Sequence, residues 1–115
     1  MKKVLLVEDD KNIVEIVEHI LTTYGFDVYS HNSGLGVEKV ISEYNPNVVL
    51  LDIQLPGKLG TQVCKDLKET SDIPIILFSA QPNQAELVKE SNANAFLDKP
   101  FDIKELIASV GLYSN

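Results

Sequence analysis

The sequence has 115 residues, a length that fits one compact domain over residues 1–115 and leaves little room for a second. Because 44% of its residues are hydrophobic, the chain can bury a core, which argues against intrinsic disorder. The formal net charge of −7 leaves no excess of basic groups to neutralise phosphates, so we expect neither a nucleic-acid binder nor a protein that binds an anionic membrane.

The first half of the chain alternates short apolar runs with amphipathic stretches. Residues 4–7 predict a strand that is buried on both faces. This run is too short for a signal peptide or a membrane span, so we expect a cytoplasmic protein. Apolar residues recur at helical spacing over residues 11–24. Residues 26–31 predict a second strand, and Ser33 is placed to cap a helix that ends near Tyr44.

The second half repeats this alternation, and its first strand ends abruptly at Asp52. The remaining predicted strands cover residues 48–51, 74–78 and 95–97, and the helices cover residues 61–70, 83–91 and the chain from Phe101 onward. Strands that alternate with helices pair in parallel through right-handed crossovers. The sequence therefore predicts an α/β fold, a doubly wound parallel sandwich.

Polar residues follow the apolar strands at the points where these strands end: Glu8, Asp9, Asp52, Ser79 and Lys99. A charge at the end of a fully apolar strand needs a compensating partner, because burial of an unpaired charge is costly. In open parallel sheets, functional sites form beyond the carboxyl ends of the strands. We therefore expect three carboxylates, one hydroxyl and one ammonium to meet at a single edge of the sheet.

The predicted carboxylate cluster needs a divalent cation. Two unit charges about 4 Å apart repel by roughly 4 kcal/mol at an effective dielectric constant of about 20, and one lysine cannot neutralise three acids. Oxygen ligands suit Mg²⁺ better than zinc, with Mn²⁺ as an alternative. Asp9 and Asp52 would bind the ion directly, together with the backbone carbonyl of Gln54. Glu8 would act through water.

A cation beside a carboxylate and a lysine predicts phosphoryl transfer with Asp52 as the nucleophile. The transferred group spreads negative charge over its oxygens, so Lys99 would pair with one oxygen and Ser79 would hydrogen-bond another. Pro100 would fix the turn that holds Lys99 inward, and a cis peptide bond is one way to do so.

Four motifs in chain order resemble the receiver domain of response regulators in two-component signalling: VLLVEDD at residues 4–10, VVLLD at 48–52 followed by LPG, FSA at 78–80, and KPF at 99–101. The resemblance covers essentially the whole chain. It implies a flavodoxin-like, three-layer sandwich around a five-stranded sheet in the order 2-1-3-4-5. It also implies that Glu8 and Asp9 are the acid pair, Asp52 the phosphoacceptor, Lys99 the phosphate-binding lysine, and Ser79 and Phe96 the switch residues.

The same resemblance implies partners. The phosphodonor would be a phosphohistidine on a histidine kinase or a histidine phosphotransfer protein, and the downstream target would be another protein. Gln54 and Gln81 flank the site, and we expect them to tune how fast water attacks the acyl phosphate.

The chain departs from the family pattern in a few places. The segment between Ser79 and Phe96 is shorter than usual, which predicts a displaced or short fourth helix. Asn92 stands where glycine is common, and asparagine tolerates the left-handed conformation. Phe96 lacks the hydroxyl of the more common tyrosine, so a switch at this position would move a purely apolar ring.

Several other residues have simpler interpretations. Asp10 is expected to cap a helix. We expect His19 and His31 to be surface residues that do not lie at the carboxyl ends of strands, and Cys64 to be a small buried hydrophobic residue that cannot form an internal disulfide.

Three functions fit the sequence. The first is a stand-alone response regulator receiver, a phosphorelay switch that catalyses its own aspartyl phosphorylation and dephosphorylation and is not a metabolic enzyme. The alternative is a pseudo-receiver, an adaptor or dimerisation module that works without phosphorylation. A third is an enzyme that turns over phosphorylated metabolites. Such enzymes carry an acid two residues beyond the nucleophile, where this chain has Gln54, and a cap for which the chain has no room.

Overall fold

The structure, a computed structural model, describes residues 1–81, 83–100 and 102–115. Five parallel strands form one sheet in the order β2-β1-β3-β4-β5, which confirms the predicted order. The strands are β1 (Lys3–Val7), β2 (Asp27–His31), β3 (Val48–Asp52), β4 (Ile75–Ser79) and β5 (Ala95–Asp98). The helices are α1 (Lys11–Thr23), α2 (Val37–Tyr44), α3 (Gly60–Thr70), α4 (Ala85–Ser91) and α5 (Ile103–Tyr113).

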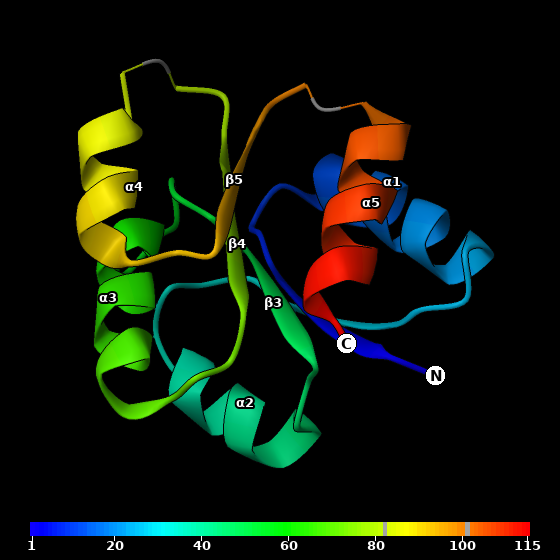
Figure 1. Ribbon diagram of the computed structural model, residues 1–115, viewed down its shortest axis with the longest axis horizontal. Coiled ribbons are helices and arrows are strands. Elements are labelled where there is room, and N and C mark those ends of the chain that lie inside the picture. Colours follow the sequence, from blue (N-terminus) through cyan, green and yellow to red (C-terminus); the bar gives the residue numbers. More distant parts are fainter. Residues whose placement is uncertain (82, 101) are drawn as a thin grey trace.

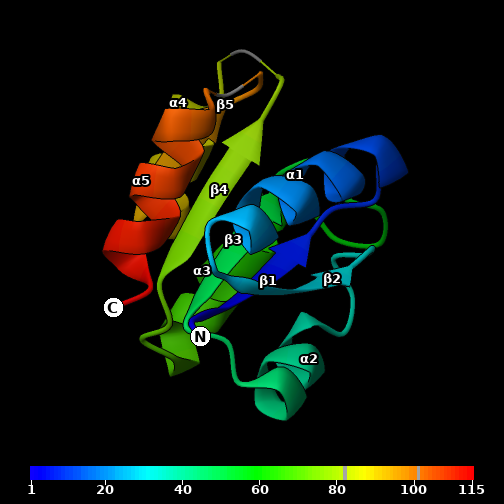
Figure 2. The ribbon, with the colours of Figure 1, turned by 90° about the vertical axis from the view of Figure 1, so that its right-hand side faces the viewer.

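Helices cover both faces of the sheet, with α1 and α5 on one side and α2, α3 and α4 on the other (Figure 1). Alternate strand residues point to opposite faces, so each strand contributes to two cores. Leu5 and Val7 belong to the core beneath α2, α3 and α4, whereas Val4 and Leu6 belong to the core beneath α1 and α5. Figure 2 shows the strands running in one direction, which brings their carboxyl ends to the same edge of the sheet.

Helix boundaries follow the local capping chemistry. Asp10 caps α1 as predicted, because its carboxylate accepts hydrogen bonds from the backbone N–H groups of Asn12 and Ile13. Asn92 takes the expected left-handed conformation, with a φ of 63°, at the end of α4. Cys64 is fully buried, which confirms its assignment as a core residue.

Two predicted helix starts are wrong. Helix α2 begins at Val37, and its cap is Gly36 rather than the predicted Ser33, because Gly36 adopts a left-handed conformation that delays the helix. Helix α4 begins at Ala85 and has 7 residues, since Asn83 has a φ of 61° that a helix cannot include. The expected short fourth helix is thus present.

The last helix starts slightly later than expected. Asp102 caps α5 by accepting a hydrogen bond from the N–H of Lys104. Phe101, where this helix was predicted to begin, and Pro82 lie outside the described residues. Within the part of the chain that the structure describes, the helices all lack the length and apolar character that crossing a bilayer requires.

Candidate phosphorylation and metal site

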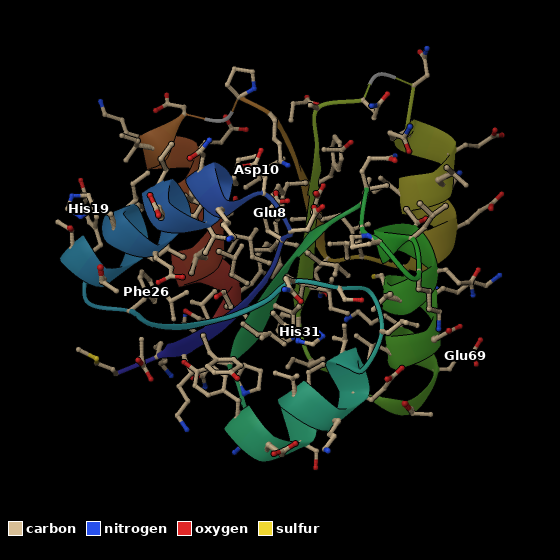
Figure 3. All side chains as sticks on the ribbon, turned by 180° about the vertical axis from the view of Figure 1, so that it is seen from behind. Glu8, Asp10, His19, Phe26, His31 and Glu69 are labelled. Carbon is tan, nitrogen blue, oxygen red and sulfur yellow. The ribbon has the colours of Figure 1, made fainter. Side chains whose placement is uncertain are left out.

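A cluster of carboxylates lies at the carboxyl edge of the sheet. Glu8 and Asp9 follow β1, and Asp52 is the last residue of the adjacent β3. One carboxylate oxygen from each of the three lies within 4.8 Å of the others. Glu8 is 2% and Asp52 4% exposed, whereas Asp9 faces solvent. Figure 3 shows Glu8 at the end of its strand, near Asp10 at the start of α1.

Lys99 is the cation that the structure pairs with this cluster. Its Nζ lies 2.7 Å from Glu8 Oε1 and 3.5 Å from Asp52 Oδ1. The same ammonium lies 4.6 Å from the centroid of the Phe78 ring. One ammonium between two nearly buried carboxylates balances only one of their two negative charges, and Asp9 adds a third carboxylate to the cluster.

The electrostatics of Glu8 reflect this imbalance. Burial is the largest cause that raises the pKa of the Glu8 carboxyl above its usual value, and the neighbouring Asp52 carboxyl raises it further. The Lys99 ammonium and the backbone N–H of Asp10 act in the opposite direction and lower this pKa. The net rise therefore reflects mainly the removal of this carboxylate from water, with a smaller contribution from the neighbouring Asp52.

Both oxygens of Glu8 already have partners. Oε1 accepts from Lys99, and Oε2 accepts from the backbone N–H groups of Asp9 and Asp10 at 3.0 and 3.1 Å. Asp52 Oδ1 accepts a hydrogen bond of 3.3 Å from the N–H of Gln54. Glu8 therefore acts as an anchor for the cluster, and Asp9 and Asp52 are better placed to donate oxygen ligands.

The donor set fits a hard divalent cation. All three side chains offer carboxylate oxygens, and Mg²⁺ prefers oxygen ligands with part of its shell left as water. Asp9 and Asp52 would hold such an ion together with the carbonyl of Gln54, an exposed residue two positions beyond the end of β3.

The remaining predicted site residues lie at the ends of β4 and β5. Ser79 is buried, and its Oγ accepts a 3.0 Å hydrogen bond from the N–H of Gln81. The backbone N–H of Lys99 donates to the Ser79 carbonyl at 2.9 Å, so the two strand ends are joined. The peptide bond between Lys99 and Pro100 is cis. Phe96 is partly buried against the core beneath α3 and α4.

Comparison with known proteins identifies the family. A family model described as the response regulator receiver domain matches residues 4–111. The chain belongs to this family. The BeF3-activated N-terminal receiver domain of Klebsiella pneumoniae RstA is 31% identical to it, with a TM-score of 0.93 and 99% of each chain covered.

Two further solved structures are similar to the whole receiver domain. The receiver domain of the Francisella response regulator 1452 is 30% identical, with a TM-score of 0.90, and the match covers 99% of this chain and 97% of that one. The signal receiver domain of a signal transduction histidine kinase from Syntrophus aciditrophicus is 26% identical, with a TM-score of 0.91 and coverage of 99% and 90%.

His31 corrects one prediction from the sequence. It is the last residue of β2 and pairs in register with Val7, so it does lie at the carboxyl end of a strand. It lines an open pocket of about 390 Å³ beside Glu8 and Asp9 in this receiver domain. The predicted strand over residues 26–31 already contained this signal. His19, in contrast, lies on the outer surface of α1 (Figure 3).

A second hollow of the receiver domain adjoins the site and was not predicted. It has a volume of about 410 Å³ and is mostly apolar, and its lining residues are Ile13, Ile16, Val17, Ala80, Lys99 and Pro100. Ile16 is 58% exposed, although it is one of the helically spaced apolar residues between residues 11 and 24 that would be expected to face the core. Lys99 both lines the hollow and contacts Glu8 and Asp52, so the hollow adjoins the carboxylate cluster.

Proposed function

We propose that this receiver domain is a phosphorylation switch in which Asp52 accepts a phosphoryl group from a phosphohistidine in a Mg²⁺-dependent reaction. One observation carries the proposal. The carboxylate of Asp52, nearly buried at the end of an apolar strand, lies 3.5 Å from the Lys99 ammonium. One of its oxygens also lies within 4.8 Å of an oxygen from each of two other carboxylates, close enough for the three to share one ion. A structural role alone does not account for so much uncompensated charge.

The proposed reaction balances at Asp52. A carboxylate oxygen of Asp52 attacks the phosphorus in line, the P–N bond of the phosphohistidine breaks, and the histidine nitrogen leaves with the bonding electron pair. The switch returns to its unphosphorylated state by hydrolysis: water attacks the phosphorus, the bond to the Asp52 oxygen breaks, and inorganic phosphate and the free carboxylate are formed. A bound Mg²⁺ would supply positive charge near the transferred oxygens.

The chain's own residues would bind and orient the new group. Lys99 would move from the carboxylate pair to a phosphoryl oxygen, because the ammonium already lies near Asp52. Ser79 would donate a hydrogen bond to a second oxygen. Phe96 lies on β5, directly before the segment that carries Lys99, and only partly in the core, so a change at Ser79 and Lys99 would alter its packing and the surface nearby.

The acceptor is tested with a small acyl phosphate and Mg²⁺. The intact mass should show one added phosphoryl group. Asp52→Asn should abolish this addition, and Asp66→Asn, a change at a half-buried position on α3, should leave it intact. Labelling that persists in Asp52→Asn would refute the assignment. Treatment with BeF3 and Mg²⁺ offers a second test, since the similar Klebsiella domain is BeF3-activated.

The metal is tested separately from the chemistry. Mg²⁺ at about ten times its dissociation constant should stabilise the fold by about 1.4 kcal/mol, and Mn²⁺ should act similarly. This stabilisation should disappear in the variant Asp9→Asn/Asp52→Asn. An equal rise in melting temperature in wild type and double variant would show that the ion binds elsewhere.

We propose that the apolar hollow beside Lys99 receives the histidine kinase or phosphotransfer protein. Ile16→Ser should slow transfer from the phosphorylated partner and leave labelling by a small acyl phosphate unchanged, because only the protein donor needs the hollow. Equal slowing with both donors would contradict this role.

Gln54 and Gln81 are proposed to set the lifetime of the phosphorylated state. Substitution of either residue should change the rate at which the phosphorylated protein decays.

The cellular setting is also a proposal. A cytoplasmic, stand-alone switch would act by docking to a downstream protein, and the mass of the native polypeptide tests whether the domain stands alone. A pseudo-receiver remains the alternative. Binding of a downstream partner that is indifferent both to phosphorylation and to Asp52→Asn would favour that alternative.

A further inference from the structure

We propose that the loop between β2 and α2, residues 32–36, braces the loop between β3 and α3, residues 53–59, and that His31 is a positioning residue for the metal site. The proposal rests on the proposed function, because the braced loop contains Gln54, whose carbonyl is a proposed ligand. It concerns residues that lie outside the carboxylate cluster.

The two loops are in direct contact. The carbonyl of Pro56 accepts hydrogen bonds from the N–H of Gly34 at 3.0 Å and from Ser33 Oγ at 3.3 Å. Gly34 lies so close to its neighbour that a Cβ atom at this position would be 2.0 Å from the carbonyl oxygen of Lys58. The two backbones therefore leave no room for a side chain between them, and this close packing restricts the outer part of the β3–α3 loop.

His31 connects this contact to the acidic end of β1. Its ring Nε2 lies 2.7 Å from the Leu35 carbonyl, which can only accept, so Nε2 carries the hydrogen and donates it. The N–H of Leu35 donates to Ser33 Oγ at 3.0 Å, and the N–H of Glu8 donates to the His31 carbonyl at 3.0 Å. A chain of contacts therefore runs from Glu8 through His31, Leu35 and Ser33 to Pro56.

The inner end of the β3–α3 loop is held independently. The N–H of Gly60 donates to the Ile53 carbonyl at 2.8 Å, and the N–H of Ile53 donates to Phe78 at 3.1 Å. The stretch that contains Gln54 thus lies between one anchor near Ile53 and another at Pro56. Without the second anchor this stretch would sample more conformations. Ion binding would then have to order it, and the lost conformational entropy would weaken the affinity for Mg²⁺.

The test compares His31→Leu, His31→Gln and His19→Leu in the full chain, with Mg²⁺ affinity measured by calorimetry. Loss of the ring donor in His31→Leu should weaken Mg²⁺ binding by about threefold to tenfold, the equivalent of one net hydrogen bond. The amide of His31→Gln can still donate toward Leu35, so its affinity should approach that of wild type. His19→Leu removes an exposed histidine from α1 and should change nothing.

A second readout needs no metal. Amide hydrogen exchange at Gly34, whose N–H donates to Pro56, should accelerate in His31→Leu and return toward the wild-type rate in His31→Gln. Should His31→Leu fail to fold, Ser33→Ala interrupts the same chain of contacts and is expected to weaken Mg²⁺ binding to a similar degree.

The outcomes separate the two proposals. Unchanged Mg²⁺ affinity in folded His31→Leu or Ser33→Ala, with wild type binding Mg²⁺ and accepting a phosphoryl group, overturns the bracing role alone. Equal losses in His31→Leu and His31→Gln would show that the histidine matters for its shape and not for its donor, and would also overturn it. Wild type that neither binds Mg²⁺ nor is labelled would overturn both proposals.

Discussion

Lys99→Met should destabilise the metal-free protein, and the loss should grow as the pH rises. Methionine is close to lysine in length and can keep the contact with the Phe78 ring, but it removes the ammonium 2.7 Å from Glu8. Glu8 would then be a buried carboxylate without its charged partner. Such a group either keeps its charge at a high cost or takes up a proton.

The option of protonation sets an upper limit on the loss. Holding a proton on a glutamate whose ordinary pKa is 4.5 costs about 3 kcal/mol at about pH 7, since each pKa unit is worth about 1.36 kcal/mol. At about pH 5 the same limit is below about 1 kcal/mol. The pKa of Glu8 is already raised in the intact protein, so the loss at neutral pH should be about 1–3 kcal/mol.

The sign of the pH dependence follows from linkage. Removing Lys99 raises the folded-state pKa of Glu8 further, so the folded variant binds the proton more tightly than the unfolded chain does. The free energy of unfolding of the variant is therefore highest below about pH 4.5, and it falls as the pH rises toward the raised pKa of Glu8. Most of the deficit should therefore develop between about pH 5 and about pH 7.

The assay is urea unfolding of wild type and variant at both pH values with a chelator present. Lys58→Met is a matched control, because Lys58 forms an ion pair with Asp66 on α3 that is only half-buried. Lys58 holds the pKa of Asp66 below its ordinary value of 3.8, and its removal lets this pKa return toward that value. Both assay pH values lie above it, so the control should show no comparable trend. A deficit for Lys99→Met that is the same at both pH values would refute the electrostatic account of Glu8.

Three shorter predictions concern other positions. Burial raises the pKa of the Cys64 thiol, so a thiol reagent should label Cys64 only as fast as the protein unfolds. Burial, and then the hydrogen bond to Asp27, raises the pKa of Tyr44 to about 12. Alkaline titration should therefore show a late tyrosine step that Tyr44→Phe removes. The fold should lose stability between about pH 10 and about pH 12, because the folded state holds this proton more tightly than the unfolded chain does. Gly60→Ala would place a Cβ 2.0 Å from the Asp52 carbonyl oxygen, so chemical denaturation should show a loss of roughly 2–4 kcal/mol, and a neutral effect would contradict the close approach.

Most of the strands could be predicted because they are runs of apolar residues bounded by turn residues; β2, with the sequence DVYSH, is the exception. The runs at residues 4–7 and 48–51 lie within β1 and β3, and Asp10 caps α1 as its residue type suggests. The helix starts were harder. Ser33 has the chemistry of a cap, but its hydroxyl donates a hydrogen bond to the Pro56 carbonyl of a distant loop, and Gly36 stands at the N-cap of α2 instead.

The candidate site divides in the same way. Glu8, Asp9, Asp52 and Lys99 could be placed at one edge, since the ends of parallel strands share an edge whatever the details of packing. The importance of His31 was missed, although the predicted strand ended on it. Its role depends on Leu35 and Pro56, which are brought to it by loop packing that leaves no local signal in the sequence.

By itself, the order of apolar runs and strand-end polar residues determined the α/β class and the identity of the charged groups at the sheet edge, because both follow from short-range periodicity. Only the tertiary structure decided which charged groups have partners. Both carboxylate oxygens of Glu8 accept hydrogen bonds, from Lys99 and from two backbone N–H groups, whereas Asp9 is exposed to solvent. It also decided which loop supports which. Distances of this kind arise from long-range packing between segments, and the burial and compensation of each charge depend on them.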